Sequence, residues 1–331
     1  MSLHLRKRGR STRTLVRIAY SKFFACENCM KDQASEYIDE LLERPRMTSA
    51  ERRRLEANLF CPNCEAHLDP HYDQVVSHTD EELRVLRRRT LWSKRYGHRF
   101  KRFHEFLTKH PSLGAAHPIG KRLAQAVRQA PTINLAPKTW YRARNPIKNR
   151  RLTVADFLPP DPRKVSISPG RFNHAGQSAF YVADSAKTAA VEKLGKQEAQ
   201  IWIAEVTITR PIRILDVRTM RLLEDDPSFP LVLAGLVYEG VVSRPTAGDL
   251  SYPQYHIPRY IADLVRLRKL DGIIYTSSKE YPFRPDVFGT NLVIVRPGLQ
   301  EIIRTKEPRL FRWTESKIFW LPEMRPEEIK E

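Results

Sequence analysis

The sequence is poor in several features that define large protein classes. Its 331 residues include only four cysteines, and no apolar run approaches the roughly 20 residues that a membrane-spanning helix needs. The basic N-terminus lacks the apolar core of a secretory signal, so we expect a cytoplasmic protein with no membrane association. There is no internal repeat, no P-loop, no GxGxxG and no HExxH motif. These absences argue against secreted and membrane proteins, P-loop enzymes, Rossmann dinucleotide-binding proteins and HExxH metalloproteases.

Acidic residues are also scarce relative to basic ones. The chain has 57 Lys and Arg against 38 Asp and Glu, a net charge of +19, and residues 1–130 hold 26 of the basic and 15 of the acidic residues. A field of this sign attracts polyanions, which include nucleic acid, an acidic partner protein and a nucleotide substrate. General solubility explains the same charge equally well.

The cysteines themselves form a pattern. They fall into two CxxC knuckles separated by 31 residues, and two intervening residues let both sulfurs of a knuckle point at one ion. We therefore predict a structural zinc ion, because four thiolates leave no open position for catalysis. Disulfides are the alternative, but they fit a cytosolic chain poorly. The predicted ligands are Cys26, Cys29, Cys61 and Cys64.

The chain around the knuckles is predicted to be helical. Segments 33–43 and 49–59 have helical patterns, and Thr48 and Glu51 have the spacing of a capping box. His67 and His71 could replace a zinc ligand, but surface positions are the simpler interpretation.

Residues 80–110 are predicted to form a strongly basic helical region. Its Lys and Arg residues alternate with four aromatic residues. This pattern suits the backbones and bases of nucleic acids. It also suits an ordinary amphipathic helix that packs its aromatic rings inward, which is the interpretation we favour. The aromatic residues on which this interpretation rests are Trp92, Tyr96, Phe100 and Phe103.

The most informative stretch is GRFNHAGQSAFYVADSAKTAAVEKL, residues 170–194. It predicts a turn over residues 170–173, a strand over 178–182 and a helix over 186–194 that Gly195 closes. An apolar stripe runs along that helix, and Glu192 lies at its edge. A carboxylate in this position is either a solvent-exposed side chain or part of a functional site. Residue statistics alone favour the solvent-exposed side chain.

The order of residues in this stretch resembles the RES-domain family, which is named for Arg, Glu and Ser. Arg171 opens the motif RFNxxG, Tyr181 follows ten residues later, and Glu192 lies on the helix. Downstream, the segment 270–279 followed by 289–295 resembles the family's strand–Ser–strand unit, which makes Ser277 the serine match. The resemblance covers residues 139–297, about half of the chain.

The resemblance implies an ADP-ribosyltransferase-like fold and an NAD-degrading toxin of a bacterial toxin–antitoxin pair, with an antitoxin protein as partner. NAD would be the substrate, and its nicotinamide–ribose bond would be cleaved by hydrolysis or phosphorolysis. A carboxylate near the sugar would stabilise the oxocarbenium-like transition state, as in glycosidases, and Glu192 is our candidate. The implied catalytic set is Glu192, Arg171, Tyr181 and Ser277, and the implied NAD contacts are Arg142, Gly170, Phe172 and Asn173.

We therefore predict an α+β protein with a mixed sheet and flanking helices in its larger domain. A mainly helical, basic zinc-knuckle domain would occupy residues 1–115, and a linker would follow at 116–138. The RES domain would span 139–300, and a tail, 301–331, would pack on it. Strands are predicted at 139–144, 200–208, 212–217, 273–276 and 291–295, and an amphipathic helix at 258–270.

Two other functions fit the same sequence. One is an ADP-ribosyltransferase that modifies a nucleic acid or a protein and docks through the basic first domain. The other is a non-catalytic, zinc-dependent nucleic-acid-binding protein.

Overall fold

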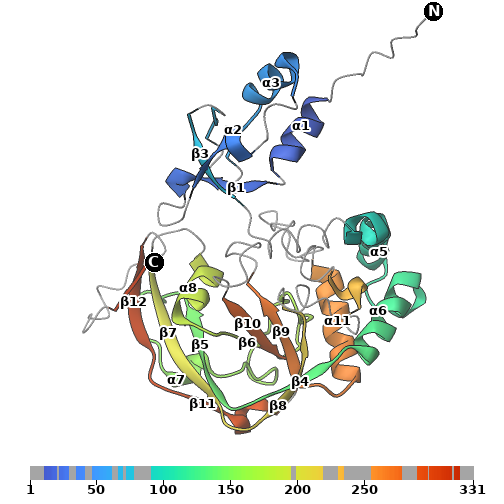
Figure 1. Ribbon diagram of the computed structural model, residues 1–331. Helices are drawn as coiled ribbons and strands as arrows, with labels where there is room; N and C mark the ends of the chain where they lie inside the picture. The colour runs from blue at the N-terminus through green and yellow to red at the C-terminus, as the bar shows by residue number, and fades with distance from the viewer. Residues whose placement is uncertain are drawn as a thin grey trace, which may run out of the picture. The chain divides into compact units, whose positions relative to one another are not determined.

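The computed structural model divides the chain into two compact units, Met1–Arg87 and Arg88–Glu331 (Figure 1). Among the described residues, no helix is long and apolar enough to cross a membrane. The structure describes residues 11–20, 22–29, 35–41, 47–61, 66–69, 72–77, 91–194, 199–218, 230–234, 255–277, 289–296, 298–314 and 317–320.

The first unit combines helices with a small antiparallel sheet of order β1-β3-β2. Helix α3 (Ser49–Glu56) begins at a capping box, as predicted. Glu51 N–H donates to Thr48 Oγ1, and Thr48 N–H donates to Glu51 Oε2. The unit is less helical than we expected, because residues 36–37 pair with β3 as a strand. Its elements are α1 (Thr12–Ala19), β1 (Phe23–Cys26), a 3₁₀ turn (Glu27–Cys29), β2 (Glu36–Tyr37), α2 (Ile38–Leu41), α3 (Ser49–Glu56) and β3 (Gln74–Ser77).

The second unit is built on a ten-stranded mixed sheet with flanking helices, which confirms the predicted α+β class. The strand order is β13-β12-β7-β5-β6-β10-β9-β8-β4, and β11 also pairs with β7. Only β8 and β9 are parallel among the described pairs, and helix α11 lies between them in the chain. The strands are β4 (Thr132–Leu135), β5 (Lys138–Arg144), β6 (Phe180–Ala183), β7 (Ala199–Ile208), β8 (Ile212–Asp216), β9 (Gly272–Thr276), β10 (Thr290–Ile294), β11 (Ile303–Thr305), β12 (Arg309–Thr314) and β13 (Lys317–Trp320).

The helices of the second unit match the predicted segments closely. The predicted helices at 186–194 and 258–270 are present, with ends displaced by up to three residues, and the predicted basic region at 80–110 is helical over residues 93–109. The helical elements are a π-helical turn (Ser93–Gly97), α5 (His98–Lys109), a 3₁₀ turn (Gly114–Ala116), α6 (Pro118–Gln129), α7 (Val154–Phe157), α8 (Ala186–Leu194), 3₁₀ turns at Leu231–Ala234 and Leu299–Ile302, and α11 (His256–Leu267).

Alternation along the strands separates the main core from the face that carries polar groups. Phe180, Ile274 and Leu292 are buried in one apolar cluster. Their neighbours along the strands, Tyr181, Tyr275 and Asn291, have side chains on the opposite face because successive strand residues alternate. That opposite face is the one that α8 covers, since Ala183, Ala189 and Ala190 share a second apolar cluster.

The units do not divide where the sequence suggested. Helix α5 belongs to the second unit, which begins at residue 88 instead of near 115. Strand β4 lies in the segment predicted as a linker and pairs with β8, and β12 lies in the predicted tail and pairs with β7. Strands β4 and β12 form because they pair with strands distant in the sequence. A local pattern of four to six residues does not reveal such pairing.

The four aromatic residues singled out in the basic region are buried, whereas Phe106 of the same region is half-buried. Trp92, Tyr96, Phe100 and Phe103 are all at most 6% exposed. This result confirms the amphipathic-helix interpretation for residues 91–109. The segment 81–89, predicted to be helical as well, lies outside the described residues.

Candidate functional site

Helix α8 sits unusually close to the strands beneath it. Ser185 Oγ accepts a hydrogen bond from Thr188 N–H at 3.0 Å and so fixes the helix start. Thr188 then packs against Gly289, where an added Cβ would lie only 1.9 Å from Thr188 Oγ1. Gly289 therefore allows the close approach that brings Glu192, one turn further along α8, over the ends of β9 and β10.

Glu192 is held by two buried donors. Ser277 Oγ donates to Glu192 Oε1 at 2.7 Å, and Asn291 Nδ2 donates to the same oxygen at 2.6 Å. Ser277 is 1% exposed and Asn291 is 4% exposed. The two donors share a sheet face because Asn291 pairs with Tyr275 and Ser277 N–H bonds to Gly289 O. These two donors orient the Glu192 carboxylate, so Glu192 is not simply a solvent-exposed side chain.

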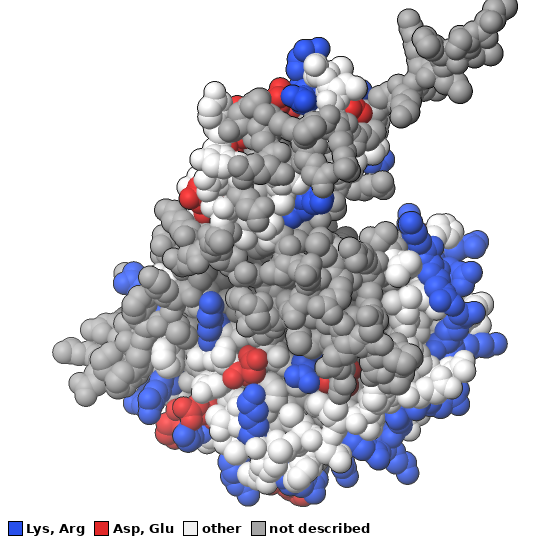
Figure 2. Space-filling model, viewed as in Figure 1, with Lys and Arg blue, Asp and Glu red and all other residues white. Residues whose placement is uncertain are grey.

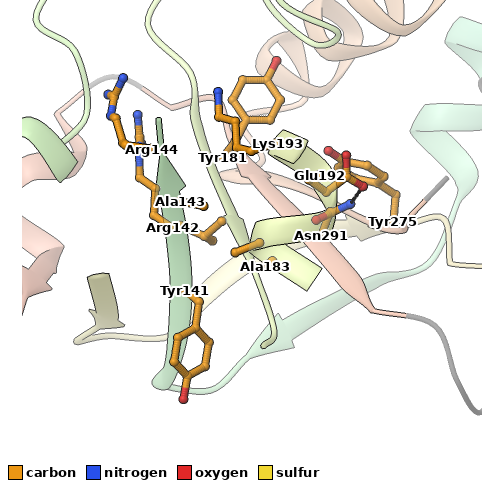
Figure 3. Close-up of a pocket in the computed structure, with 12 residues that line it drawn as sticks. Tyr141, Arg142, Ala143, Arg144, Tyr181, Ala183, Glu192, Lys193, Tyr275 and Asn291 are labelled. Carbon is orange, nitrogen blue, oxygen red and sulfur yellow. Dashed lines mark hydrogen bonds between the residues drawn. The ribbon is translucent and has the colours of Figure 1, made fainter. Parts of the chain in front are cut away.

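A cavity of about 240 Å³ opens beside this carboxylate. In Figure 3, Glu192 lies next to Asn291 and Tyr275, and Arg142 and Arg144 project from β5. The volume is at the low end for small-molecule sites, so the cavity can enclose part of a dinucleotide but not all of it. Its lining residues are Tyr141, Arg142, Ala143, Arg144, Tyr181, Val182, Ala183, Ala189, Glu192, Lys193, Tyr275 and Asn291.

Two arginines give the cavity an anion-binding character. No described residue accepts a hydrogen bond from Arg142 Nη1 or Arg144 Nε, although both atoms are buried. Burial, and then the charge of Arg144, lowers the pKa of Arg142 to about 9, which still leaves it protonated at neutral pH. Burial also lowers the pKa of Arg144, while Asp156 opposes this shift. Buried donors of this kind are normally satisfied by an acceptor, and an anionic ligand would supply one.

Two tyrosines line the same cavity. Tyr181 donates its hydroxyl proton to Asn173 Oδ1 at 3.0 Å and accepts from Phe172 N–H at 2.8 Å. Burial raises the pKa of Tyr181 to about 12, so its phenol stays neutral. The pKa of Tyr275 is also raised, first by burial and then by the negative charge of Glu192. Neither tyrosine can therefore act as an anionic base near pH 7.

Hydrogen bonds between its own residues hold the loop that follows Gly170. Asn173 Nδ2 donates to the carbonyl oxygens of Ser168, His174 and Gln177. Gly170 is needed because a Cβ there would lie 2.4 Å from Asn173 Oδ1. Phe172 and Asn173, which we predicted as NAD contacts, are buried in the loop, and they and Gly170 are absent from the described cavity lining.

The guanidinium of Arg171 lies over two aromatic rings near the cavity. Its guanidinium lies 5.3 Å from the ring centroid of Tyr275 and 5.6 Å from that of Phe172. Neither Arg171 nor Ser277 belongs to the described lining of the cavity, whereas Glu192, Tyr181 and Arg142 do. The structure thus brings the predicted residues into one region, with Ser277 behind Glu192 and Arg171 behind Tyr275.

Sequence reasoning missed five polar residues of the cavity lining, which are Tyr141, Arg144, Lys193, Tyr275 and Asn291. Arg144 follows Arg142 by two residues on one strand, and this period-two spacing was a usable signal. Asn291 is a polar residue at the start of an otherwise apolar buried strand, which was a second signal. Tyr275 and Lys193 carried no signal of their own, because tyrosines in strands and lysines on helices are common.

The predicted zinc ligands are only partly described. The side chains of Cys26, Cys29 and Cys64 lie outside the described residues, and no metal-binding group of His, Cys, Asp or Glu occurs within them. Cys61 is buried in a cluster with Phe23 and Val75. Cys26 pairs with Val75 across the sheet, so both knuckles belong to one packed module.

The structure describes one of the two histidines near the second knuckle. His67 is exposed, and its ring Nε2 lies 2.9 Å from Glu56 O, as expected of a surface residue. His71 lies outside the described residues.

Comparison with known proteins gives one family match. Residues 139–314 match the family model of the RES domain. One solved structure, from the M. tuberculosis MbcT–MbcA toxin–antitoxin complex, is 15% identical over 58% of this chain and 92% of that one, with a TM-score of 0.32. No curated protein matches the sequence.

Proposed function

The chain belongs to the RES-domain family, and on this basis we propose that it degrades NAD and acts as the toxin of a toxin–antitoxin pair. The observation that carries the proposal is the Glu192 carboxylate, held by Ser277 and Asn291 at the wall of a cavity that two half-buried arginines also line. The antitoxin is a protein partner in this proposal.

The proposed reaction breaks the bond between ribose C1′ and the nicotinamide nitrogen. The bonding electron pair leaves with nicotinamide, which becomes neutral, while positive charge develops on the sugar. Glu192 stabilises that charge by electrostatic attraction. Ser277 and Asn291 fix the carboxylate in advance, so little reorganisation is needed as the charge forms.

The arginines bind the other end of the reacting half. Arg142 and Arg144 offer buried donors to the pyrophosphate, and guanidinium groups suit phosphate oxygens through paired hydrogen bonds. Tyr275 and Tyr181 supply neutral walls for the nicotinamide and ribose. Arg171 supports Tyr275 from behind and adds positive charge to this part of the site.

The products of NAD turnover test this proposal. The purified protein should release free nicotinamide from NAD, together with ADP-ribose if water is the acceptor or its phosphate if phosphate is the acceptor. Label that moves from NAD onto DNA, RNA or protein would instead support the ADP-ribosyltransferase. The absence of any turnover by folded protein, with and without phosphate, would contradict the enzyme.

Expression in cells tests the toxin role separately. Wild-type protein should arrest growth and deplete cellular NAD, and Glu192→Gln should relieve both effects. Harmless high-level expression of an active enzyme would contradict the toxin role without touching the chemistry.

We also propose that the two knuckles bind one structural zinc ion through Cys26, Cys29, Cys61 and Cys64. The support is the pair of CxxC motifs and the packing of Cys61 and β1 in one module. The ion takes no part in the proposed reaction.

A further inference from the structure

Helices α5 and α6 carry a dense basic surface that the proposed reaction does not use. Residues 93–129 contain nine Lys and Arg and a single acid, Glu105. Figure 2 shows these basic side chains gathered over the two helices. We call the exposed set the basic face, and it consists of Lys94, Arg95, Arg99, Lys101, Arg102, Lys109, Lys121, Arg122 and Arg128.

The exposed positions of α5 and α6 offer almost no apolar anchor, although Leu113 on the turn between the two helices is exposed. Apart from Pro118 at the start of α6, every exposed residue of α5 and α6 is polar. Phe100 and Phe103 are buried, as are Leu107, Leu123 and Val127, and Phe106 is half-buried. Specific protein interfaces depend on buried aromatic and aliphatic anchors, so this face is a poor match for a protein partner.

The basic face is fixed to the body of the second unit. Tyr260 of α11 donates to Gly120 O at 3.1 Å, and its ring packs against Phe103. Arg268 Nη1 donates to the carbonyl oxygens of Val127 and Ala130 at the end of α6. The charges therefore stand on a rigid platform, which lowers the ordering entropy that binding must overcome.

We propose that the basic face binds the phosphate backbone of duplex nucleic acid without sequence preference. Clustered Lys and Arg neutralise phosphates and release condensed counterions, and this effect alone supports non-specific binding. Residues 93–109 extend over roughly 25 Å, a length along which a duplex presents many phosphates. No Phe, Tyr or Trp ring on α5 or α6 is fully exposed, and Phe106 is half-buried, so single strands find few of the stacking contacts that make them preferred ligands elsewhere.

The basic face lies outside the segment that matches the RES family, residues 139–314. The proposal therefore does not depend on NAD turnover, and each can fail without the other. Its function would be to hold the protein on nucleic acid while the catalytic site remains free.

The test uses fluorescence anisotropy with the full-length protein and a labelled random-sequence DNA duplex of about 20 base pairs, between roughly 50 and 200 mM salt. The wild type should bind with a steep salt dependence. The variant Lys101→Ala/Arg102→Ala/Lys109→Ala removes three charges of α5, so the slope of log K against log salt should become shallower by about 2.7. NAD turnover by this variant should be unchanged.

A matched variant, Lys148→Ala/Arg151→Ala/Lys164→Ala, removes three exposed charges elsewhere and should bind the duplex as the wild type does. The proposal is overturned if the α5 variant keeps the wild-type affinity and slope. It is also overturned if a single strand binds more tightly than the duplex, or if polyglutamate of equal charge displaces the duplex equally well.

Discussion

Glu192→Gln is the substitution that bears most directly on the proposed chemistry. It removes the negative charge but keeps the shape of the side chain, and the amide oxygen can still accept from Ser277 and Asn291. The fold should therefore survive. A carboxylate about 4 Å from the sugar cation, in a half-buried site with an effective dielectric constant of about 20, contributes about 4 kcal/mol. Each 1.36 kcal/mol is a factor of ten, so kcat should fall by about a thousandfold.

The assay is nicotinamide release from NAD under saturating substrate, with thermal unfolding as the test of folding. Glu301→Gln, an exposed acid distant in sequence, is the matched control and should keep the wild-type rate. If Glu192→Gln unfolds at the wild-type temperature and retains more than about a tenth of the wild-type kcat, the electrostatic argument is refuted.

The site and the knuckles lead to four further predictions. Asn291→Ala removes a hydrogen bond to the Glu192 carboxylate, worth about 1.5–3 kcal/mol, so kcat should fall about tenfold to a hundredfold; an unchanged kcat would deny Asn291 a positioning role. Arg142→Ala should raise the Kd for NAD, measured on the Glu192→Gln background, by at least about tenfold, whereas Lys148→Ala should not. The affinity of the Glu192→Gln protein for NAD should weaken as pH rises through about 9, because Arg142 loses its proton there; affinity that is constant to pH 10 would contradict this assignment. Elemental analysis should find one zinc per chain, and Cys61→Ser should lower the melting temperature without changing the kcat of the protein that remains folded; metal-free, stable wild-type protein would remove the zinc.

The local patterns in the sequence predicted the elements of the second unit well. The alanine-rich segment of α8 and the apolar, β-branched run of β7 are local features, so the sequence indicated both elements directly. Strand β4 and the short β2 could not be predicted in this way. Each pairs with residues more than 30 positions away, and short segments take their conformation from such partners.

The site was only partly predictable for the same reason. Glu192 at the edge of an apolar stripe was ambiguous until the donors from β9 and β10 were located. Those donors are 85 and 99 residues away, so no local pattern connects them. For Phe172 and Asn173 the sequence suggested a role in the site that the structure does not show. Their position in the motif suggested ligand contacts, whereas both side chains are buried inside the loop.

The basic region illustrates how burial separates two interpretations of one pattern. Aromatic residues spaced among Lys and Arg at helical intervals fit both base stacking and inward packing. The burial of Trp92 and Phe100 decides for packing, since a ring that is 4% or less exposed cannot stack on a base. The charges remain outside, and this is why the inferred ligand is a duplex backbone.

A crystal structure of the Glu192→Gln protein with NAD would show directly whether residue 192 faces the nicotinamide ribose. We expect that ribose beside residue 192, with the pyrophosphate bonded to Arg142 and Arg144. NAD bound elsewhere on the protein, or with its adenine end in this cavity, would contradict this expectation.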